Sequence, residues 1–504
     1  MLIRKFRTAI SVAQQAGGRR VVELAARAAS EGVQLAAFPV LPDTRRLQHF
    51  HRRANAQPEF TPLSVSVDEF RQGDSSLLFQ YMALQFGRCI KPSSAVTSGL
   101  EKFVLLDAAY QLWQFDSIVR DADWYLDCPD AFSRRHRQII TRSLLRAGQI
   151  SRAKRLAGRR LQSADAATAL LMADVWNAAD DDDFAAEAYD RAFGLAPYNP
   201  MVLLHRGFHF LKTGRISDGF RQWCIADRLF GAYPALPQSR LWHGEALDGK
   251  RIVVLFEHGL GDMIQLSRFL PELQSRYPGA LISAKIPLPL TRLFKHSYPT
   301  VGCLNRLDRR SIDYYIPSVQ LPAALGVSHI TPSKGYIPPV RSTVHQRRSS
   351  AKIGICWRGH PRAYEMSRSV GVEEMSTLFD LPNCEFLSLV YQPTEQERAY
   401  LDGFSNVTLP AFEGFDEMLS IVEQCDVVVT VDTAAAHLAG AAGVKVFLLT
   451  RPDSCWRWGV RGAQNPWYQS VTVMRHDEDM DWPLVIARTK ELLGRGAGRT
   501  AMAS

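Results

Sequence analysis

One stretch of the chain, residues 431–443, constrains the fold more than any other. It begins Val-Asp-Thr, continues with alanines and glycines, and lies between two apolar segments, 426–430 and 444–449, that are rich in β-branched residues. Two such segments around a short helix of small residues predict a βαβ unit with a buried parallel sheet. Asp432 and Thr433 then fall where the first strand turns into the helix.

This placement favours a binding site for a phosphorylated ligand. Open α/β folds bind ligands at the carboxyl edge of the sheet, and a helix start offers backbone N–H groups to an anion. The same residues also fit a simpler interpretation, in which Asp432 or Thr433 only caps a well-packed Ala/Gly helix.

The chain has 504 residues, which is enough for two or three domains. It contains no run of about 18 apolar residues, and its basic first 30 residues lack the continuous apolar core of a secretory signal. The eight cysteines are scattered without metal-ligand spacing, which favours a reducing compartment. We therefore expect a cytoplasmic protein without a transmembrane segment, with peripheral contact at the inner face of the membrane as an open alternative.

The net charge of +9 favours anionic ligands such as sugar nucleotides or phosphorylated lipids. Nucleic acid is not expected as a partner, because no basic stripe with interleaved aromatic residues stands out. Two acidic triplets, 121–123 and 477–479, resemble an Asp-x-Asp metal motif, but neither follows a strand of a plausible nucleotide domain. We expect no metal site, and we interpret the acidic run 180–183 as a solvated loop or a helix start.

The region before about residue 245 has a helical pattern with an internal echo. Residues 144–151 recur as 210–217, offset by 66 positions, and 185–197 has the pattern of a second helix between them. Two steps of about 33 residues match helix–turn–helix repeats of the tetratricopeptide type. The alternative is an ordinary helical bundle. Repeat arrays of this kind usually present a concave surface to a protein partner.

Beyond a junction at 232–249, strands and helices alternate, which predicts two doubly wound α/β domains joined by a linker at 332–350. The first strands of the two domains are expected at 251–256 and 352–357. The predicted organisation is a basic segment (1–60), a helical repeat domain (61–240), an amino-terminal α/β domain (241–340) and a carboxy-terminal α/β domain (341–504). Helices are expected near 394–402 and 415–424, with a closing helix over 481–493. The two α/β domains form a cleft between them.

The loop after the first of these strands carries a carboxylate that can act as a base. Gly259 and Gly261 are expected to let the backbone turn sharply, so that Asp262 falls at a helix start and faces the cleft. If partial burial raises its pKa, this side chain can take a proton from an acceptor hydroxyl. The alternative is an Asp that only caps the helix. The full dinucleotide-binding fingerprint Gly-x-Gly-x-x-Gly is absent.

Six fragments of the chain together resemble a known family. They occur in the order found in bacterial tetratricopeptide-repeat glycosyltransferases, whose catalytic half is similar to the lipopolysaccharide heptosyltransferases of glycosyltransferase family 9. The fragments are 256–265, Trp357, Arg368-Ser369, Val431-Asp432-Thr433 with 437–440, Trp456-Arg457-Trp458, and Pro466-Trp467-Tyr468. The resemblance covers about residues 240–493. It implies a GT-B-like catalytic region of two Rossmann-like domains, acceptor side first and nucleotide-sugar side second, preceded by an all-α repeat domain.

The resemblance also implies roles for individual residues. Asp262 matches the carboxylate proposed as the base in the heptosyltransferases. Asp432 and Thr433 match an Asp-Thr-Gly element that holds the pyrophosphate of the donor, and Ala434 stands where that element has its glycine. His437 lies one helical turn further along the same face, as a donor contact or as a satisfied buried histidine.

Other positions depart from the family pattern or complete the donor site. His258 stands where repeat-containing relatives commonly have Gln. No lysine matches the phosphate-binding lysine of the heptosyltransferases, so Arg358 or Arg368, the latter followed by Ser369, has to supply that charge. Trp357 is expected to be exposed to the cleft. Four aromatic residues are expected to pack the rim of the second domain or to stack on a base: Trp456, Trp458, Trp467 and Tyr468.

The function implied is transfer of a hexose or heptose from a nucleotide sugar to a hydroxyl acceptor, by an inverting and metal-independent displacement. The nucleotide sugar is a co-substrate, and no cofactor is expected. The acceptor is a protein or a cell-envelope glycan, docked on the helical repeats in one version of the hypothesis. Two alternatives are a scaffold for protein–protein interaction with a decayed catalytic half, and a GT-B epimerase that hydrolyses its own nucleotide sugar.

Overall fold

The computed structural model describes most of the chain from residue 115 onward. The described residues are 106, 109–110, 115–127, 130–162, 164–231, 233, 236–308, 310–340, 350–359, 368–459, 463–475 and 481–502. The predicted basic segment 1–60 and the acidic triplet 477–479 lie outside these ranges. The chain divides into two compact units, Met1–Leu144 and Leu145–Ser504.

The described part of the first unit contains two short helices and most of a longer one. These are α7 (Phe115–Arg120), α8 (Ala122–Leu126) and α9 (Asp130–Arg146), the last of which continues into the second unit. The acidic triplet 121–123 falls at the start of α8, where the Asp121 carboxylate accepts a hydrogen bond of 3.2 Å from the Arg120 guanidinium.

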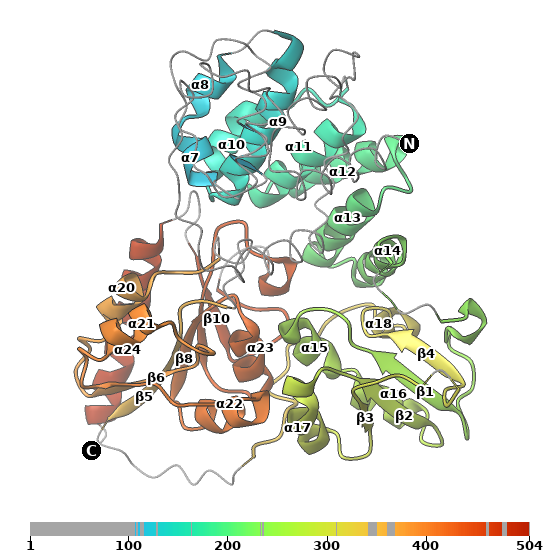
Figure 1. Cartoon of the computed structure of the whole chain (residues 1–504), viewed down its shortest axis with the longest axis vertical. Coiled ribbons are helices and arrows are strands. Elements are labelled where there is room, and N and C mark those ends of the chain that lie inside the picture. The colour runs from blue at the N-terminus through green and yellow to red at the C-terminus, as the bar shows by residue number, and fades with distance from the viewer. Residues whose placement is uncertain are drawn as a thin grey trace, which may run out of the picture. The chain divides into compact units, whose positions relative to one another are not determined.

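The second unit begins with helices that follow one another at a regular spacing (Figure 1). They are α10 (Ile150–Ala157), α11 (Ala166–Ala178), α12 (Asp182–Leu195), α13 (Pro200–Lys212) and α14 (Ile216–Leu229). From α11 to α13 the starts move from residue 166 to 200, and from α12 to α14 from 182 to 216, which is 34 positions in both cases. This spacing agrees with the predicted helix–turn–helix period. Membership of the tetratricopeptide class stays a prediction.

The acidic run at 180–183 is a helix start, as one of its two interpretations predicted. Asp181 caps α12, because its side chain accepts a hydrogen bond of 3.2 Å from the backbone N–H of Phe184. The buried ammonium of Lys212, at the end of α13, pairs with Asp180 at 2.8 Å and with Asp182 at 3.1 Å. The acidic turn therefore ties one helical hairpin to the next.

The first α/β domain has a four-stranded parallel sheet in the order β3-β2-β1-β4. A 3₁₀ turn, η2 (Gln238–Arg240), precedes it. Its strands are β1 (Arg251–Leu255), β2 (Leu281–Lys285), β3 (Gly302–Leu304) and β4 (Tyr314–Pro317). Its helices are α15 (Leu260–Ser267), α16 (Leu270–Arg276), α17 (Leu288–Ser297) and α18 (Leu321–Ala324).

The second α/β domain has a six-stranded parallel sheet in the order β10-β9-β8-β5-β6-β7. Its strands are β5 (Ala351–Cys356), β6 (Cys384–Ser388), β7 (Val407–Thr408), β8 (Val427–Val431), β9 (Val446–Leu449) and β10 (Val471–Met474). Its helices are α20 (Val372–Met375), α21 (Glu395–Leu401), α22 (Phe415–Val422), α23 (Ala434–Ala441) and α24 (Trp482–Met502), with 3₁₀ turns η3 (Ser376–Leu378) and η4 (Trp456–Trp458).

Both sheets have the strand order of a doubly wound fold, and the predicted fold class, two Rossmann-like domains of GT-B type, is confirmed. In each sheet the first strand, β1 or β5, pairs with the next strand in the chain, β2 or β6, on one side. On its other side it pairs with β4 or β8, where the chain crosses back over the sheet. Ligands bind where the strand order reverses, outside the carboxyl ends of the strands. In the second domain this point lies between Cys356, at the end of β5, and Val431, at the end of β8.

Part of the predicted linker is packed against the second domain. The backbone N–H groups of Tyr336 and Ile337 both donate to the carbonyl oxygen of Ala441, at 2.7 and 3.0 Å. The Tyr336 hydroxyl donates to the carbonyl oxygen of Ile264 at 2.9 Å, so this short segment contacts both α/β domains. Gly443 has a φ of +75°, and a Cβ there would lie 2.3 Å from the carbonyl oxygen of Lys334. Only glycine fits this contact without a shift of the backbone.

Gly443→Ala should therefore lower the free energy of unfolding by roughly 2–5 kcal/mol, because a positive φ and an overlap with backbone are both forced on the alanine. Gly249→Ala is the matched control, since Gly249 also has a positive φ, +67°, but nothing within 4 Å of the added Cβ. Denaturant unfolding of both variants measures the difference. If both variants lost the same free energy of unfolding, the contact between Gly443 and Lys334 would contribute nothing to stability.

Candidate functional site

The predicted base Asp262 lies at the start of helix α15, directly after β1. It occupies the third position of the helix, where its Oδ2 accepts a hydrogen bond of 3.3 Å from the backbone N–H of Gly259. The side chain is 23% exposed. Capping fixes the orientation of this carboxylate and leaves its other oxygen for a second partner.

The role predicted for the two glycines of this loop is wrong. Gly259 has a φ of −64°, and neither it nor Gly261 has a positive φ, so no special turn is required. Gly261 instead allows close packing, because a Cβ there would lie 2.6 Å from Cδ2 of His437 and 3.4 Å from Cα of Ala434. The starts of helices α15 and α23 therefore meet face to face across the domain boundary.

A buried arginine of the second domain pairs with Asp262. The Nη2 of Arg457, in η4, forms an ion pair with Oδ1 of Asp262, and its Nε donates to Oε1 of Gln265 at 3.1 Å. The guanidinium lies 4.4 Å from the ring centre of Trp456 and 5.5 Å from that of Trp223. Burial acts to lower the pKa of Arg457, but Asp262, together with Cys455 and Asp432, raises it above its ordinary value.

Asp432 follows β8 at the switch point of the second sheet and is also buried, at 9% exposure. Its Oδ2 accepts a hydrogen bond of 3.1 Å from Nη1 of Arg368. Burial acts to raise the pKa of Asp432, but the charge of Arg368, with smaller contributions from His437 and Arg457, lowers it below its ordinary value. The Arg368 side chain is 41% exposed, so the outer member of this pair can reach solvent.

The start of α23 is not capped by its own N-cap side chain. The Thr433 hydroxyl makes no capping bond and instead lies 3.1 Å from the Thr430 hydroxyl and 3.7 Å from Sγ of Cys356. Thr433 therefore occupies the N-cap position of this helix, as the simpler interpretation predicted, but its side chain does not form the capping bond. Ala434 is the first residue of the helix and lies against Gly261.

His437 is buried at the contact between the two domains. Its Nδ1 lies 2.9 Å from the Tyr468 hydroxyl, and its ring lies tilted against that of Trp458 at 4.7 Å between centroids. Burial lowers the pKa of His437 to about 4, with Arg457 adding to the effect, so the ring is neutral near pH 7. Its place as a donor contact stays a prediction, and its hydrogen bond satisfies the buried ring.

The four aromatic residues near this contact pack inside the domain. Trp456, Trp458, Trp467 and Tyr468 are each exposed by 5% or less, which confirms the predicted packing role.

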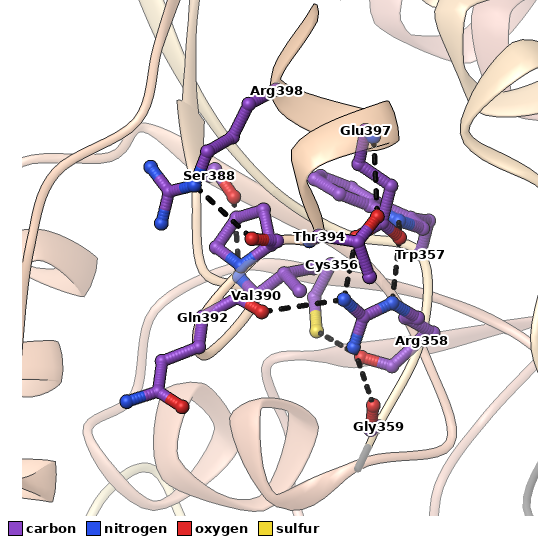
Figure 2. A network of polar contacts seen from close by, with 11 residues as sticks. Cys356, Trp357, Arg358, Gly359, Ser388, Val390, Gln392, Thr394, Glu397 and Arg398 are labelled. Atoms are coloured by element: carbon purple, nitrogen blue, oxygen red, sulfur yellow. Dashed lines mark hydrogen bonds and ion pairs between the residues drawn. The ribbon is translucent and has the colours of Figure 1, made fainter. Parts of the chain in front are cut away.

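Trp357 and Arg358 are both buried, and Figure 2 shows their contacts with Glu397. The predicted exposure of Trp357 is wrong: it is 1% exposed, and its indole N–H donates to Oε1 of Glu397 at 2.7 Å. The Arg358 guanidinium donates to both carboxylate oxygens of Glu397, at 2.6 and 2.5 Å, and to the carbonyl oxygen of Gly359 at 3.2 Å. Arg358 is therefore held by the first turn of α21, and it is not presented to a ligand.

Arg368 and Ser369 lie beside the end of β5, and their predicted role in donor binding stays a prediction. The backbone N–H of Val370 donates to the carbonyl oxygen of Trp357 at 2.9 Å, which draws this segment to the strand end. Residues 360–367, which connect it to β5, lie outside the described residues. Of the two arginines proposed to supply the missing positive charge, Arg368 is the one beside Asp432.

A cavity of about 570 Å³ opens at the carboxyl edge of the first sheet, where β1, β2 and β3 end. It has an apolar wall and a small set of polar groups, among which Lys285 pairs with Glu257 at 2.9 Å. Its lining residues are Phe256, Glu257, Met263, Lys285, Ile286, Pro287, Leu288, Asn305 and Arg306. Met263, which follows Asp262 on α15, lines this cavity, whereas Asp262 itself is not among the lining residues.

His258 faces the helical repeats and not the donor side. Its Nε2 lies 2.9 Å from Oδ2 of Asp227, in helix α14, and its ring centroid lies 4.9 Å from that of Trp223. Burial acts to lower the pKa of His258, but the neighbouring Asp227 carboxylate raises it above its ordinary value.

Sequence reasoning missed three residues of this site: Arg457, Glu397 and Asp227. Arg457 carried a local signal, since an arginine between two tryptophans in Trp456-Arg457-Trp458 is typical of a buried cation packed on aromatic rings. Glu397 and Asp227 carried none, because each pairs with a residue more than 30 positions away in the chain.

Two absences can be stated for the part of the chain that the structure describes. No helix there has both the length and the apolar composition needed to cross a membrane. No group of three or more His, Cys, Asp or Glu side chains there could hold a metal ion.

Comparison with known proteins gives one relative by sequence and several by structure. No protein-family model matches the chain. Protein FlbA of Caulobacter vibrioides is 23% identical over 345 residues, which cover 61% of this chain and 57% of that protein. The chain thus spans little more than half the length of this relative.

The structural neighbours include glycosyltransferases. Heptosyltransferase WaaC of E. coli, solved with ADP-2-deoxy-2-fluoro heptose, matches 49% of this chain and 99% of its own, at 10% identity and a TM-score of 0.35. A family 9 glycosyl transferase of Veillonella parvula matches 52% and 100%, at 14% identity and a TM-score of 0.36. An O-GlcNAc transferase of Thermobaculum terrenum matches 75% and 95%, at 14% identity and a TM-score of 0.22. These likenesses are weak, and the functional proposal depends on the residues of this chain.

The pair formed by Arg358 and Glu397 predicts an acid-sensitive contribution to stability. Burial acts to raise the pKa of Glu397, but hydrogen bonds from Arg358, Trp357 and the backbone of Thr394 lower it to about 2. Because the folded pKa lies below the unfolded one, the pair stabilises the fold above about pH 4.5 and loses its effect as the pH falls toward 2.

Glu397→Gln should therefore lower the melting temperature at pH 7, with the difference from the wild type narrowing steadily below about pH 4.5. Glu395→Gln is the control, since Glu395 lies on the same first turn of α21 and is exposed. Thermal unfolding across this pH range measures both variants. A difference that stays constant with pH would contradict the assigned pair.

Proposed function

We propose that this protein is a glycosyltransferase that moves a sugar from a nucleotide-sugar donor to a hydroxyl acceptor, with inversion and without a metal ion. The observation that carries the proposal is the contact between the starts of α15 and α23. It sets the Asp262 carboxylate on one wall and an uncapped helix start on the other, at the carboxyl edges of two doubly wound sheets.

The donor side of the proposal depends on positive potential. The backbone N–H groups at the start of α23 face the place of the pyrophosphate, and a helix start attracts anions. Arg368 is the countercharge, because its guanidinium is partly exposed and its partner Asp432 only holds it in place. Fixed positive charge can stabilise a departing nucleoside diphosphate without a divalent cation.

The acceptor side depends on Asp262 and on the cavity that the next residue, Met263, lines. The acceptor hydroxyl loses its proton to Asp262 as its oxygen attacks the anomeric carbon, and the bond from that carbon to the nucleoside diphosphate breaks. The cavity at the ends of β1, β2 and β3 is large enough for one or two sugar rings. A protein or a cell-envelope glycan both fit as the source of the hydroxyl.

Asp262→Asn should reduce turnover by about 10²- to 10⁴-fold with a smaller change in donor affinity, because it removes the group that takes the proton, together with the ion pair to Arg457. Release of nucleoside diphosphate from a panel of UDP-, GDP-, CMP-, ADP- and dTDP-sugars measures turnover, and titration calorimetry measures binding. Glu272→Gln, an exposed change in the same domain, is the control. Full activity in Asp262→Asn would remove this residue from the mechanism.

Arg368→Ala should weaken donor binding by about 10- to 100-fold, since a charge-assisted contact to phosphate is lost. Arg398→Ala removes the same charge from an exposed site on α21 and should bind the donor like the wild type. If the two variants bound the nucleotide equally well, the countercharge would have to be another residue.

The same panel separates the alternative functions. If no sugar nucleotide stabilises the protein against heat and none is turned over, the result would favour a scaffold with a decayed catalytic half. Ala434 and the engaged Arg358 motivate this alternative. Turnover that is complete without an acceptor, and that returns a free or epimerised sugar, would favour the epimerase.

A further inference from the structure

The last helix of the repeat region, α14, reaches the site with one face. Trp223 and Asp227 are four residues apart and therefore lie on the same side of the helix. Both are buried, at 3% and 6% exposure. Each contacts a different residue next to Asp262, so this helix is more than a spacer between the repeats and the catalytic region.

The first contact runs from Asp227 through His258 to the Asp262 loop. Oδ2 of Asp227 lies 2.9 Å from Nε2 of His258 and also accepts a hydrogen bond of 2.7 Å from the Tyr233 hydroxyl. His258 immediately precedes Gly259, whose backbone N–H holds the Asp262 carboxylate. A fixed His258 ring therefore limits the movement of the turn that orients Asp262.

The second contact runs from Trp223 through Arg457. The Trp223 ring lies 4.9 Å from the His258 ring and 5.5 Å from the Arg457 guanidinium, measured to ring centres. It also packs edge-to-face on Trp456 at 6.0 Å. Because Arg457 pairs with Asp262, the same tryptophan supports both neighbours of the carboxylate.

We propose that Asp227 and Trp223 are positioning residues for Asp262: Asp227 acts through His258, and Trp223 acts through Arg457. This inference rests on the proposed function in taking Asp262 as the base. Under it, the repeat region supplies part of the active site in addition to any surface for an acceptor.

The charged groups around His258 give the inference a pH dependence. They are Asp227 from α14, with Tyr233 hydrogen-bonded to it, Asp262 from α15, and Arg457 from η4. Asp227 and Asp262 favour the imidazolium and Arg457 opposes it, with Asp227 the strongest. The pair with Asp227 is fully formed below the ordinary histidine pKa of about 6.5 and is lost as the pH rises through the raised pKa of the folded state.

Amide hydrogen exchange in the full chain tests the positioning role without an activity assay. In Asp227→Asn, peptides covering residues 256–266 should exchange about tenfold faster or more, while peptides covering β8 keep their protection. Asp218→Asn is the matched control, because Asp218 lies on the same helix and is 41% exposed. After correction for intrinsic exchange, wild-type protection of 256–266 should fall as the pH rises above about 6.5, and His258→Gln should abolish this dependence.

Turnover provides the second readout. With a sugar nucleotide that the wild type turns over, Asp227→Asn should lower kcat by about 10- to 100-fold with little change in KM, since a misplaced base affects the reaction and not donor binding. Unchanged exchange in 256–266 would overturn the positioning role, and so would an unchanged kcat. Loss of protection throughout the chain would also overturn it, by showing a general folding effect. An inactive wild type with the expected exchange result would refute the proposed function and leave the positioning of Asp262 standing.

Discussion

The ion pair between Arg457 and Asp262 is the interaction on which the arrangement of the two α/β domains depends. A guanidinium buried without a partner costs several kcal/mol, so Arg457 is stable only while Asp262 and Gln265 of the other domain face it. The tryptophan rings around it exclude water and strengthen the pairing. Separation of the domains at this point would strand the charge, which favours the closed contact between α15 and α23.

Burial decides which arginines serve the fold and which can serve a ligand. Arg358 and Arg457 have side chains exposed by 8% and 11%, and each is enclosed by a carboxylate and further acceptors. Arg368 is 41% exposed although it also pairs with a carboxylate. Its partner Asp432 is itself buried at 9% exposure, so the bond between them also keeps a buried carboxylate satisfied. An anionic ligand can therefore reach the exposed side of Arg368 while the guanidinium keeps its bond to Asp432, whereas Arg358 and Arg457 are enclosed.

The sequence was sufficient for the architecture but not for the side-chain pairings. Strands such as β8 were predicted within one or two residues, because β-branched runs between turn residues are a local signal. Gly261 was given a turn role, since glycine spacing alone does not distinguish a turn from close helix packing. Arg358 was proposed as a phosphate ligand, and its pairing with Glu397 was missed because Glu397 lies 39 positions away and belongs to another element. Such pairings are tertiary, and no periodicity encodes them.

Helix α14 shows how the helical region and the two α/β domains become one structure. A terminal repeat normally needs a polar outer face, because no further repeat covers it. In α14 the residues Phe220, Trp223 and Asp227 are instead buried, against η4 and the loop that follows β1. The first α/β domain and η4 therefore cover the face that a further helical hairpin would cover. This explains why a charged residue is buried on that helix: Asp227 is stable there only because His258 and Tyr233 satisfy it.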